Sequence, residues 1–164
     1  MRTVIGVMGG AVVSDEALEH AYRVGQLIAE HGWVLLNGGR NAGVMAASAL
    51  GANEAGGLVV GILPSDSTTG VAPGVDIAIP TGMGDARNAI NVLSSQVVVA
   101  LQGGPGTVSE VALALKAGRS VVMVGFPLGA PFSAFYERGQ LVDTTTADEA
   151  IAVVESLVAE QDRL

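Results

Sequence analysis

Cysteine is absent from this sequence, which excludes disulfides, thiolate nucleophiles and thiolate metal ligands. Long apolar runs are missing too, and none approaches the roughly 20 residues that a membrane-spanning helix needs. Basic residues are few, 8 against 16 acidic ones, and the resulting net charge of −8 predicts no binding to nucleic acid or anionic membranes. Because no basic and apolar leader precedes the first predicted strand, we expect a cytoplasmic protein.

Aromatic residues contribute only 4% of the chain, whereas hydrophobic residues together make up 49%. The core must therefore consist of Val, Ala, Leu and Ile, and the 23 glycines are available for turns. This composition is typical of α/β proteins with a buried parallel sheet. With 164 residues, the sequence predicts one Rossmann-like, doubly wound domain over 1–164, with a mainly parallel sheet flanked by helices.

Hydrophobic patterning and turn residues divide the chain into alternating strands and helices. The expected strands are 3–8, 33–36, 58–63, 75–79, 96–101, 120–124 and an edge strand at 141–142. The expected helices are 14–30, 44–55, 85–93, 107–116 and one that opens with a capping box at Thr146 and Glu149. We expect 127–138 to be irregular with one helical turn, and 64–84 to be a mobile loop near the site.

The most informative segment is 97–110, where a buried strand runs through a glycine turn into a helix. Gly103, Gly104 and Gly106 permit a sharp turn and a close approach of a ligand to the backbone. The free N–H groups of the following helical turn attract anions, most commonly phosphate. The segment therefore predicts a phosphate site formed by Gly103, Gly104, Gly106 and Thr107.

Two other predicted strands also end in paired glycines, Gly9-Gly10 and Gly38-Gly39. Parallel strands place their carboxyl ends at one edge of the sheet, so the three turns are expected to meet around one crevice. Glycine is common after strands in any α/β fold, which is the alternative explanation for each pair. The additional Gly106 and Thr107 of the third turn favour a shared site.

Three charged residues, Arg87, Arg40 and Glu110, are candidates for the same site. Arg87 near a helix start opposes the helix dipole, which is tolerated when an anion compensates; the alternative is an arginine in solvent. Arg40, directly after Gly38-Gly39, is a weaker candidate. Glu110 is either a ligand-binding or catalytic carboxylate or the partner of Thr107 in a capping box. Neither histidine has a catalytic pattern, and no metal cluster is evident.

Residues 108–116 of one expected helix are largely apolar, and the helix expected at 85–93 is nearly as apolar. They carry more hydrophobic surface than one sheet face can cover. We therefore expect a homo-oligomer that is built first as a dimer.

Residues 103–110, Gly-Gly-Pro-Gly-Thr-Val-Ser-Glu, resemble the GGxGTxxE signature of the Lonely Guy family of phosphoribohydrolases, once mislabelled lysine decarboxylases. Segments 37–45 and 55–64 are similar to that family in order and spacing. The family's Arg-Lys pair is Arg87-Asn88 here, and its Pro before the glycines is Gln102. Residues 84–88 and 91–95 look more like the sister branch that includes the molybdenum cofactor carrier proteins, which bind a pterin phosphate on this turn and form homo-oligomers, commonly tetramers.

The resemblance implies binding of a phosphorylated pterin or nucleotide, with the molybdenum cofactor (molybdopterin) as the expected ligand of a carrier or storage protein. The amides of Gly104, Gly106 and Thr107, the Thr107 hydroxyl and Arg87 would hold the phosphate. The expected ligand-binding set is Gly9, Gly10, Gly38, Gly39, Arg87, Gly103, Gly104, Gly106, Thr107 and Glu110, with no protein ligand to a metal. In the alternative phosphoribohydrolase, Arg87 and Glu110 would be catalytic. A nucleotide-sensing domain without turnover would use the same pocket.

Overall fold

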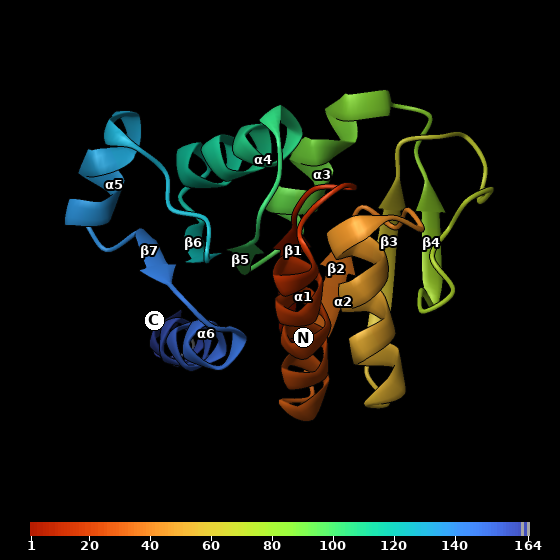
Figure 1. The fold of residues 1–164 in the computed structure, drawn as a ribbon, viewed down its shortest axis with the longest axis horizontal. Coiled ribbons are helices and arrows are strands. Elements are labelled where there is room, and N and C mark those ends of the chain that lie inside the picture. The colour runs from red at the N-terminus through yellow and green to blue at the C-terminus, as the bar shows by residue number, and fades with distance from the viewer. Residues whose placement is uncertain (162, 164) are drawn as a thin grey trace.

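The computed structural model describes residues 1–161 and 163, and contains a seven-stranded sheet in the order β4-β3-β2-β1-β5-β6-β7. All neighbouring strands in it are parallel, which confirms the predicted α/β class. The strands are β1 (Val4–Met8), β2 (Val34–Asn37), β3 (Leu58–Leu63), β4 (Ile77–Pro80), β5 (Val97–Ala100), β6 (Ser120–Val124) and β7 (Leu141–Thr144). Figure 1 shows the strands crossing the middle of the molecule.

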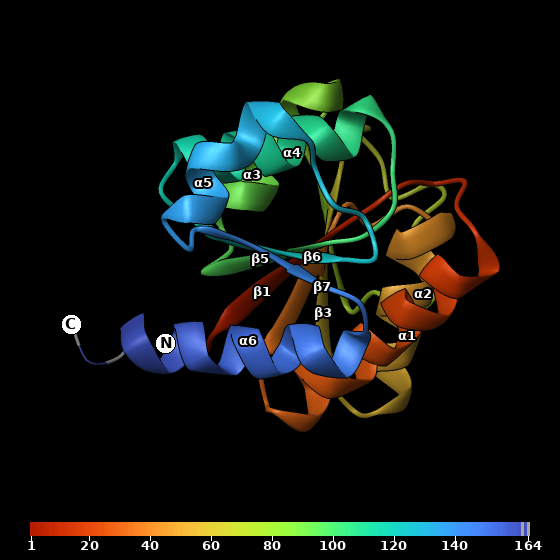
Figure 2. The same ribbon diagram turned by 60° about the vertical axis from the view of Figure 1, so that its left-hand side comes forward.

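Helices cover both faces of the sheet, as a buried parallel sheet requires. Figure 2 shows α1, α2 and α6 on one face and α3, α4 and α5 on the other. The first layer comprises α1 (Asp15–Glu30), α2 (Gly43–Glu54) and α6 (Ala147–Gln161). The second comprises α3 (Arg87–Leu93), α4 (Pro105–Lys116) and α5 (Ser133–Glu137). Short 3₁₀ turns precede two of these helices: η1 (Gly84–Ala86) precedes α3, and η2 (Ala130–Phe132) precedes α5. None of the described helices is long and apolar enough to span a membrane.

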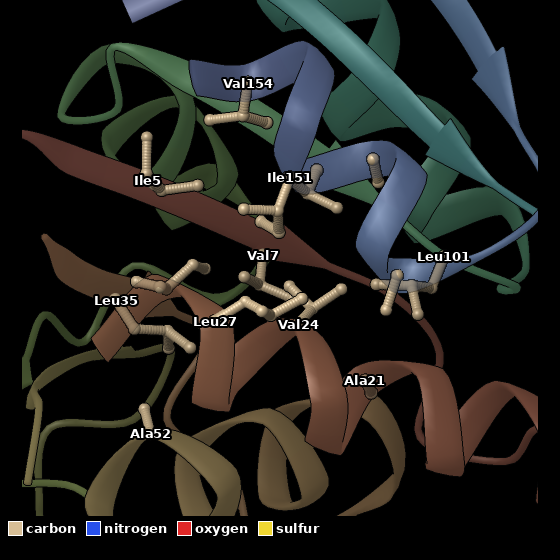
Figure 3. Packing of buried hydrophobic residues seen from close by; sticks show 14 of the residues in the cluster. Ile5, Val7, Ala21, Val24, Leu27, Leu35, Ala52, Leu101, Ile151 and Val154 are labelled. Carbon is tan, nitrogen blue, oxygen red and sulfur yellow. The ribbon is translucent and has the colours of Figure 1, made fainter. Parts of the chain in front are cut away.

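The two-residue period of the strands divides the core between the two faces. In β1, Ile5 and Val7 point toward the α1 and α6 layer, where Figure 3 shows them beside Val24 and Ile151. Met8 points to the opposite cluster, which α3 and α4 cover. Helices thus cover both faces of the central strands. A ligand can reach these strands only at their ends.

The strand order changes direction at β1. The chain adds β2, β3 and β4 on one side of β1 and then returns to place β5 on its other side. The loops after β1 and β5 therefore flank the crevice where ligands bind in such sheets. Hydrogen bonds tie the two loops together: the Gly10 amide donates to the Gln102 carbonyl (2.9 Å), and the Ser14 amide donates to Gln102 Oε1 (2.8 Å).

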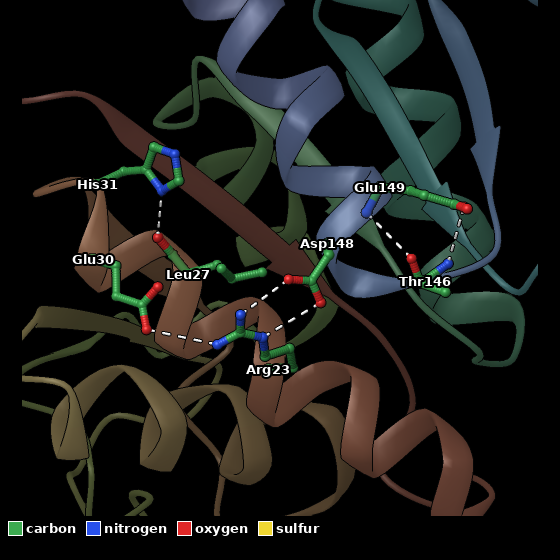
Figure 4. Close-up of polar contacts among 7 residues, drawn as sticks. All are labelled: Arg23, Leu27, Glu30, His31, Thr146, Asp148 and Glu149. Carbon is green, nitrogen blue, oxygen red and sulfur yellow. Dashed lines mark hydrogen bonds and ion pairs between the residues drawn. The ribbon is translucent and has the colours of Figure 1, made fainter.

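Most predicted elements are confirmed within two residues at their ends. Ser14 caps α1 by accepting from the Ala17 amide, and Thr146 and Glu149 form the predicted reciprocal capping box. Figure 4 shows this box beside the Arg23 to Asp148 ion pair, which joins the start of α6 to α1.

Three predictions of local structure were wrong in part. The helix expected at 107–116 begins at Pro105, because proline's fixed φ suits the first helical position. The helix expected at 85–93 is divided into η1 and α3. Segment 127–138 contains η2 and the five-residue α5 rather than one isolated turn.

Candidate functional site

A cavity of about 240 Å³ opens at the carboxyl edge of the sheet, where the loops after β1 and β2 meet the start of α4 and the polar side of α3. Its position is the one that the strand order predicts for a ligand. The lining residues are Val7, Met8, Gly9, Gly10, Ala11, Gly38, Arg40, Met45, Asp85, Arg87, Asn88, Gly104, Pro105, Gly106, Thr107 and Glu110.

The structure brings eight of the ten predicted ligand-binding residues to this cavity, and Gly39 and Gly103 do not line it. Gly39 has a φ of +72°, and a Cβ there would lie 3.0 Å from the Gly61 Cα atom on β3. A Cβ on Gly103 would lie 2.1 Å from Thr107 Oγ1. These two glycines therefore serve close packing of the turns, and ligand binding by the other eight stays a prediction.

The start of α4 points free amides into the cavity. Gly104 is the N-cap with an extended backbone, and Pro105 occupies the first helical position. The amides of Gly106 and Thr107, in the first helical turn, have no carbonyl four residues earlier inside the helix to bond. Because α4 begins before Thr107, the alternative prediction that Thr107 and Glu110 form a capping box was wrong. Glu110 lies within the helix and has a different partner.

Arg87 is buried at the base of the cavity, with 9% of its surface exposed, so the alternative of an arginine in solvent was wrong. Its guanidinium lies against Gly38, where a Cβ would be 2.3 Å from Nη1. Burial lowers the pKa of Arg87, and the charge of Arg40 lowers it further, whereas Glu110 and Asp85 raise it. The buried Nε of Arg87 has no hydrogen-bond partner among the described residues.

Glu110 is the second buried charge, with 7% of its surface exposed. Asn91 Nδ2 donates to its Oε1 at 3.0 Å. Burial raises the pKa of Glu110, against the opposing effects of this hydrogen bond and of Arg87. Within the described part of the chain, Arg87 and Glu110 form no ion pair shorter than 4.0 Å. Each charge is therefore available to a ligand in the cavity they share.

Helix α3 buries polar as well as apolar residues. Arg87, Asn88 and Asn91 are buried together with Val92, whereas Leu93 is 57% exposed. A helix on the surface of a monomer normally exposes its polar residues. In α3, Arg87 and Asn88 instead line the cavity, and Asn91 bonds to Glu110.

Sequence reasoning missed part of the lining. Asp85 and Asn88 also line the cavity, and their closeness in sequence to the candidate Arg87 is the signal that could have found them. Met8 and Met45 are buried and also line the cavity. No group of three or more potential metal ligands occurs among the described residues.

The sheet order and the edge cavity define a Rossmann-like α/β protein with a ligand crevice at its switch point. The chain belongs to the SLOG cluster4 family, whose sequence pattern matches residues 2–159. An uncharacterized protein of Archaeoglobus fulgidus is 51% identical over 126 residues, which span 76% of this chain and 81% of the relative.

Two solved structures are similar over nearly the whole chain. The molybdenum cofactor binding protein from Rippkaea orientalis is 46% identical, with a TM-score of 0.88 over 96% of this chain and 98% of the other. The molybdenum cofactor carrier protein of Chlamydomonas reinhardtii is 45% identical, with a TM-score of 0.89 over 97% and 99%. The resemblance inferred from the sequence is thereby confirmed.

Proposed function

We propose that this protein binds the phosphorylated pterin of the molybdenum cofactor and acts as its carrier or storage protein. Two proteins with 45 to 46% identity over the full fold are a molybdenum cofactor binding protein and a molybdenum cofactor carrier. The observation that carries the proposal is Arg87, a buried guanidinium whose Nε has no partner among the described residues and which lines the same cavity as the start of α4, where a helix terminus attracts anions. A buried charge without a partner is costly, and a bound anion removes that cost.

Three elements would hold the ligand. The amides of Gly106 and Thr107 and the Thr107 hydroxyl would bind the phosphate, with Arg87 supplying charge. Gly9, Gly10 and Gly38 would form the floor under the ligand, because they line the cavity without side chains. At Gly9 and Gly38 a side chain would also collide with Val44 and with Arg87, so packing requires glycine there as well. Glu110 would accept a hydrogen bond from an O–H or N–H group next to the phosphate.

Phosphate binding at the start of α4 is the first test. Sodium phosphate is expected to raise the melting temperature beyond sodium chloride of equal ionic strength, since a ligand of the native state stabilises it by mass action. A crystal grown in phosphate is expected to show the anion within about 3.2 Å of the Gly106 and Thr107 amides. The proposal fails when neither phosphate nor the molybdenum cofactor changes the melting temperature and the turn stays empty.

We also propose that the protein is a homo-oligomer, built first through the α3 side of the sheet. Leu93 of α3 and Met83 before it are 57% and 50% exposed. Ile77 and Ile79 of β4 are also exposed, and Ile79 pairs in register with Ile62, which belongs to the core cluster under α3. Exposed apolar residues on one side of a molecule favour burial against a second copy.

Light scattering is expected to give a mass of twice 16.5 kDa or a larger multiple at micromolar concentration. The double variant Ile79→Asp with Leu93→Asp should lower that mass, because two charges would be buried in the interface. Leu50→Asp is the matched control, since Leu50 is 44% exposed on α2 in the opposite helical layer. A monomer mass for the unmodified protein would refute the proposal.

A further inference from the structure

A second cavity, of about 520 Å³, lies beside the first at the ends of β2 and β3. Its lining residues are Arg40, Asn41, Ala42, Leu63, Pro64, Ser65, Thr69 and Gly70. Arg40 is the residue that the two cavities have in common. The loop expected to be mobile near the site, 64–84, therefore forms one wall of a space that adjoins the candidate phosphate site.

Backbone hydrogen bonds give the walls of this second cavity a defined shape. The Asn41 amide donates to the Gly70 carbonyl and the Ala72 amide to the Gly39 carbonyl, both at 2.9 Å. Between these bonds, Arg40 and Val71 pair as an antiparallel bridge. Ala42 and Pro64 supply apolar lining, and Leu63 behind them is buried. The loops after β2 and β3 are thus joined to each other around the cavity.

Arg40 connects the two spaces electrostatically. Its guanidinium makes no hydrogen bond or ion pair with the other described residues, and its charge lowers the pKa of Arg87. Two cations that repel each other, both facing open cavities, favour an anion between them. A guanidinium also stacks on planar rings, so Arg40 can contact a phosphate on one side and a heterocycle on the other.

The volume of the first cavity indicates that a ligand bound there extends into the second. The first cavity, at about 240 Å³, is smaller than the roughly 300 to 1,000 Å³ of sites that enclose a whole organic ligand. A phosphorylated ligand anchored on α4 must therefore continue beyond it. The second cavity offers apolar surface at Ala42 and Pro64 and hydroxyl groups at Ser65 and Thr69, a lining suited to a ring with polar edges.

We infer that the second cavity is the subsite for the planar heterocycle of the phosphorylated ligand, with Arg40 between the ring and the phosphate. This inference rests on the proposed function, because it takes the phosphate to be bound at the start of α4. It assigns ring recognition to Pro64, Ser65 and Thr69, which lie outside the glycine signature.

The test fills the second cavity without changing the first. Thr69→Trp places a large side chain in the second cavity, and Ser67→Trp is the matched control, because Ser67 is exposed in the same loop and does not line it. Calorimetric titrations use inorganic phosphate and, without oxygen, the molybdenum cofactor released from a molybdoenzyme. Thr69→Trp is expected to keep the affinity for inorganic phosphate and to lose cofactor affinity by about tenfold or more, which is about 1.4 kcal/mol. Ser67→Trp is expected to bind both as the wild type does.

Unchanged phosphate affinity shows that a Thr69→Trp protein is folded at the first cavity. A second blocking variant, Ser65→Trp, is expected to give the same selective loss. Equal cofactor affinity in wild type and both blocking variants would overturn the inference while leaving the proposed function standing. A wild type that binds neither phosphate nor cofactor would overturn both.

Discussion

Replacing Arg87 by alanine is expected to weaken binding of inorganic phosphate and of the molybdenum cofactor by on the order of a hundredfold, about 3 kcal/mol. The reason is that the guanidinium is desolvated before the ligand arrives: it is 9% exposed, lies against Gly38, and its Nε finds no partner in the described part of the chain. Charge-assisted hydrogen bonds in such surroundings are stronger than those made in water. Isothermal titration at several salt concentrations measures the loss of affinity. A loss that persists at high salt indicates a buried contact, because salt screens contacts between exposed charges.

Arg119→Ala is the matched control for this result. Arg119 also has a buried Nε without a hydrogen-bond partner among the described residues, but it binds the Leu93 carbonyl and lies outside the cavity. Its replacement is expected to lower stability and to leave ligand affinity unchanged. Arg87→Lys keeps the charge but lacks the planar guanidinium. Its ligand affinity is expected to lie between those of the wild type and Arg87→Ala. Equal affinities of wild type and Arg87→Ala would remove Arg87 from the site.

The fold could be predicted because its signals are local and repeated. Val-rich runs such as 97–100 lie between glycine turns, and sites such as Ser14 and the Thr146 capping box mark helix starts directly. The start of α4 was misplaced because Thr107 has good cap chemistry, whereas Pro105 carried the correct signal. The short α5 could not be predicted, since five residues of helix depend on packing rather than on sequence period.

The site could be predicted where sheet topology alone determines it. Parallel strands bring Gly9, Gly38 and Gly104 to one edge, so their convergence follows from strand order. What each glycine does depends on neighbours remote in sequence: Gly39 meets Gly61, and Gly103 packs on Thr107. The contact between Asn91 and Glu110 likewise joins two helices, and no spacing rule within one helix predicts it.

The variant Glu110→Gln distinguishes a carrier from a phosphoribohydrolase, once its fold and stability have been measured. Glutamine keeps an oxygen that can accept from Asn91, so the fold is expected to be retained. Burial raises the pKa of Glu110 above 4.5, so wild-type stability falls as the pH rises from below 4.5 through the raised pKa. The variant lacks this loss and is expected to be at least as stable at neutral pH, as thermal unfolding across pH would show.

Wild-type protein incubated with AMP is expected to release little or no adenine. Arg87 is followed by Asn88, a buried and uncharged residue that lines the cavity where the Lonely Guy family places lysine. Glu110→Gln is then expected to keep cofactor affinity within a few fold, because the α4 amides and Arg87 remain. In a hydrolase, the same change removes the carboxylate that faces the developing cation, at a loss of about a hundredfold or more in rate. Chromatographic detection of rapid adenine release by the wild type, abolished in Glu110→Gln, would therefore replace the carrier with the enzyme.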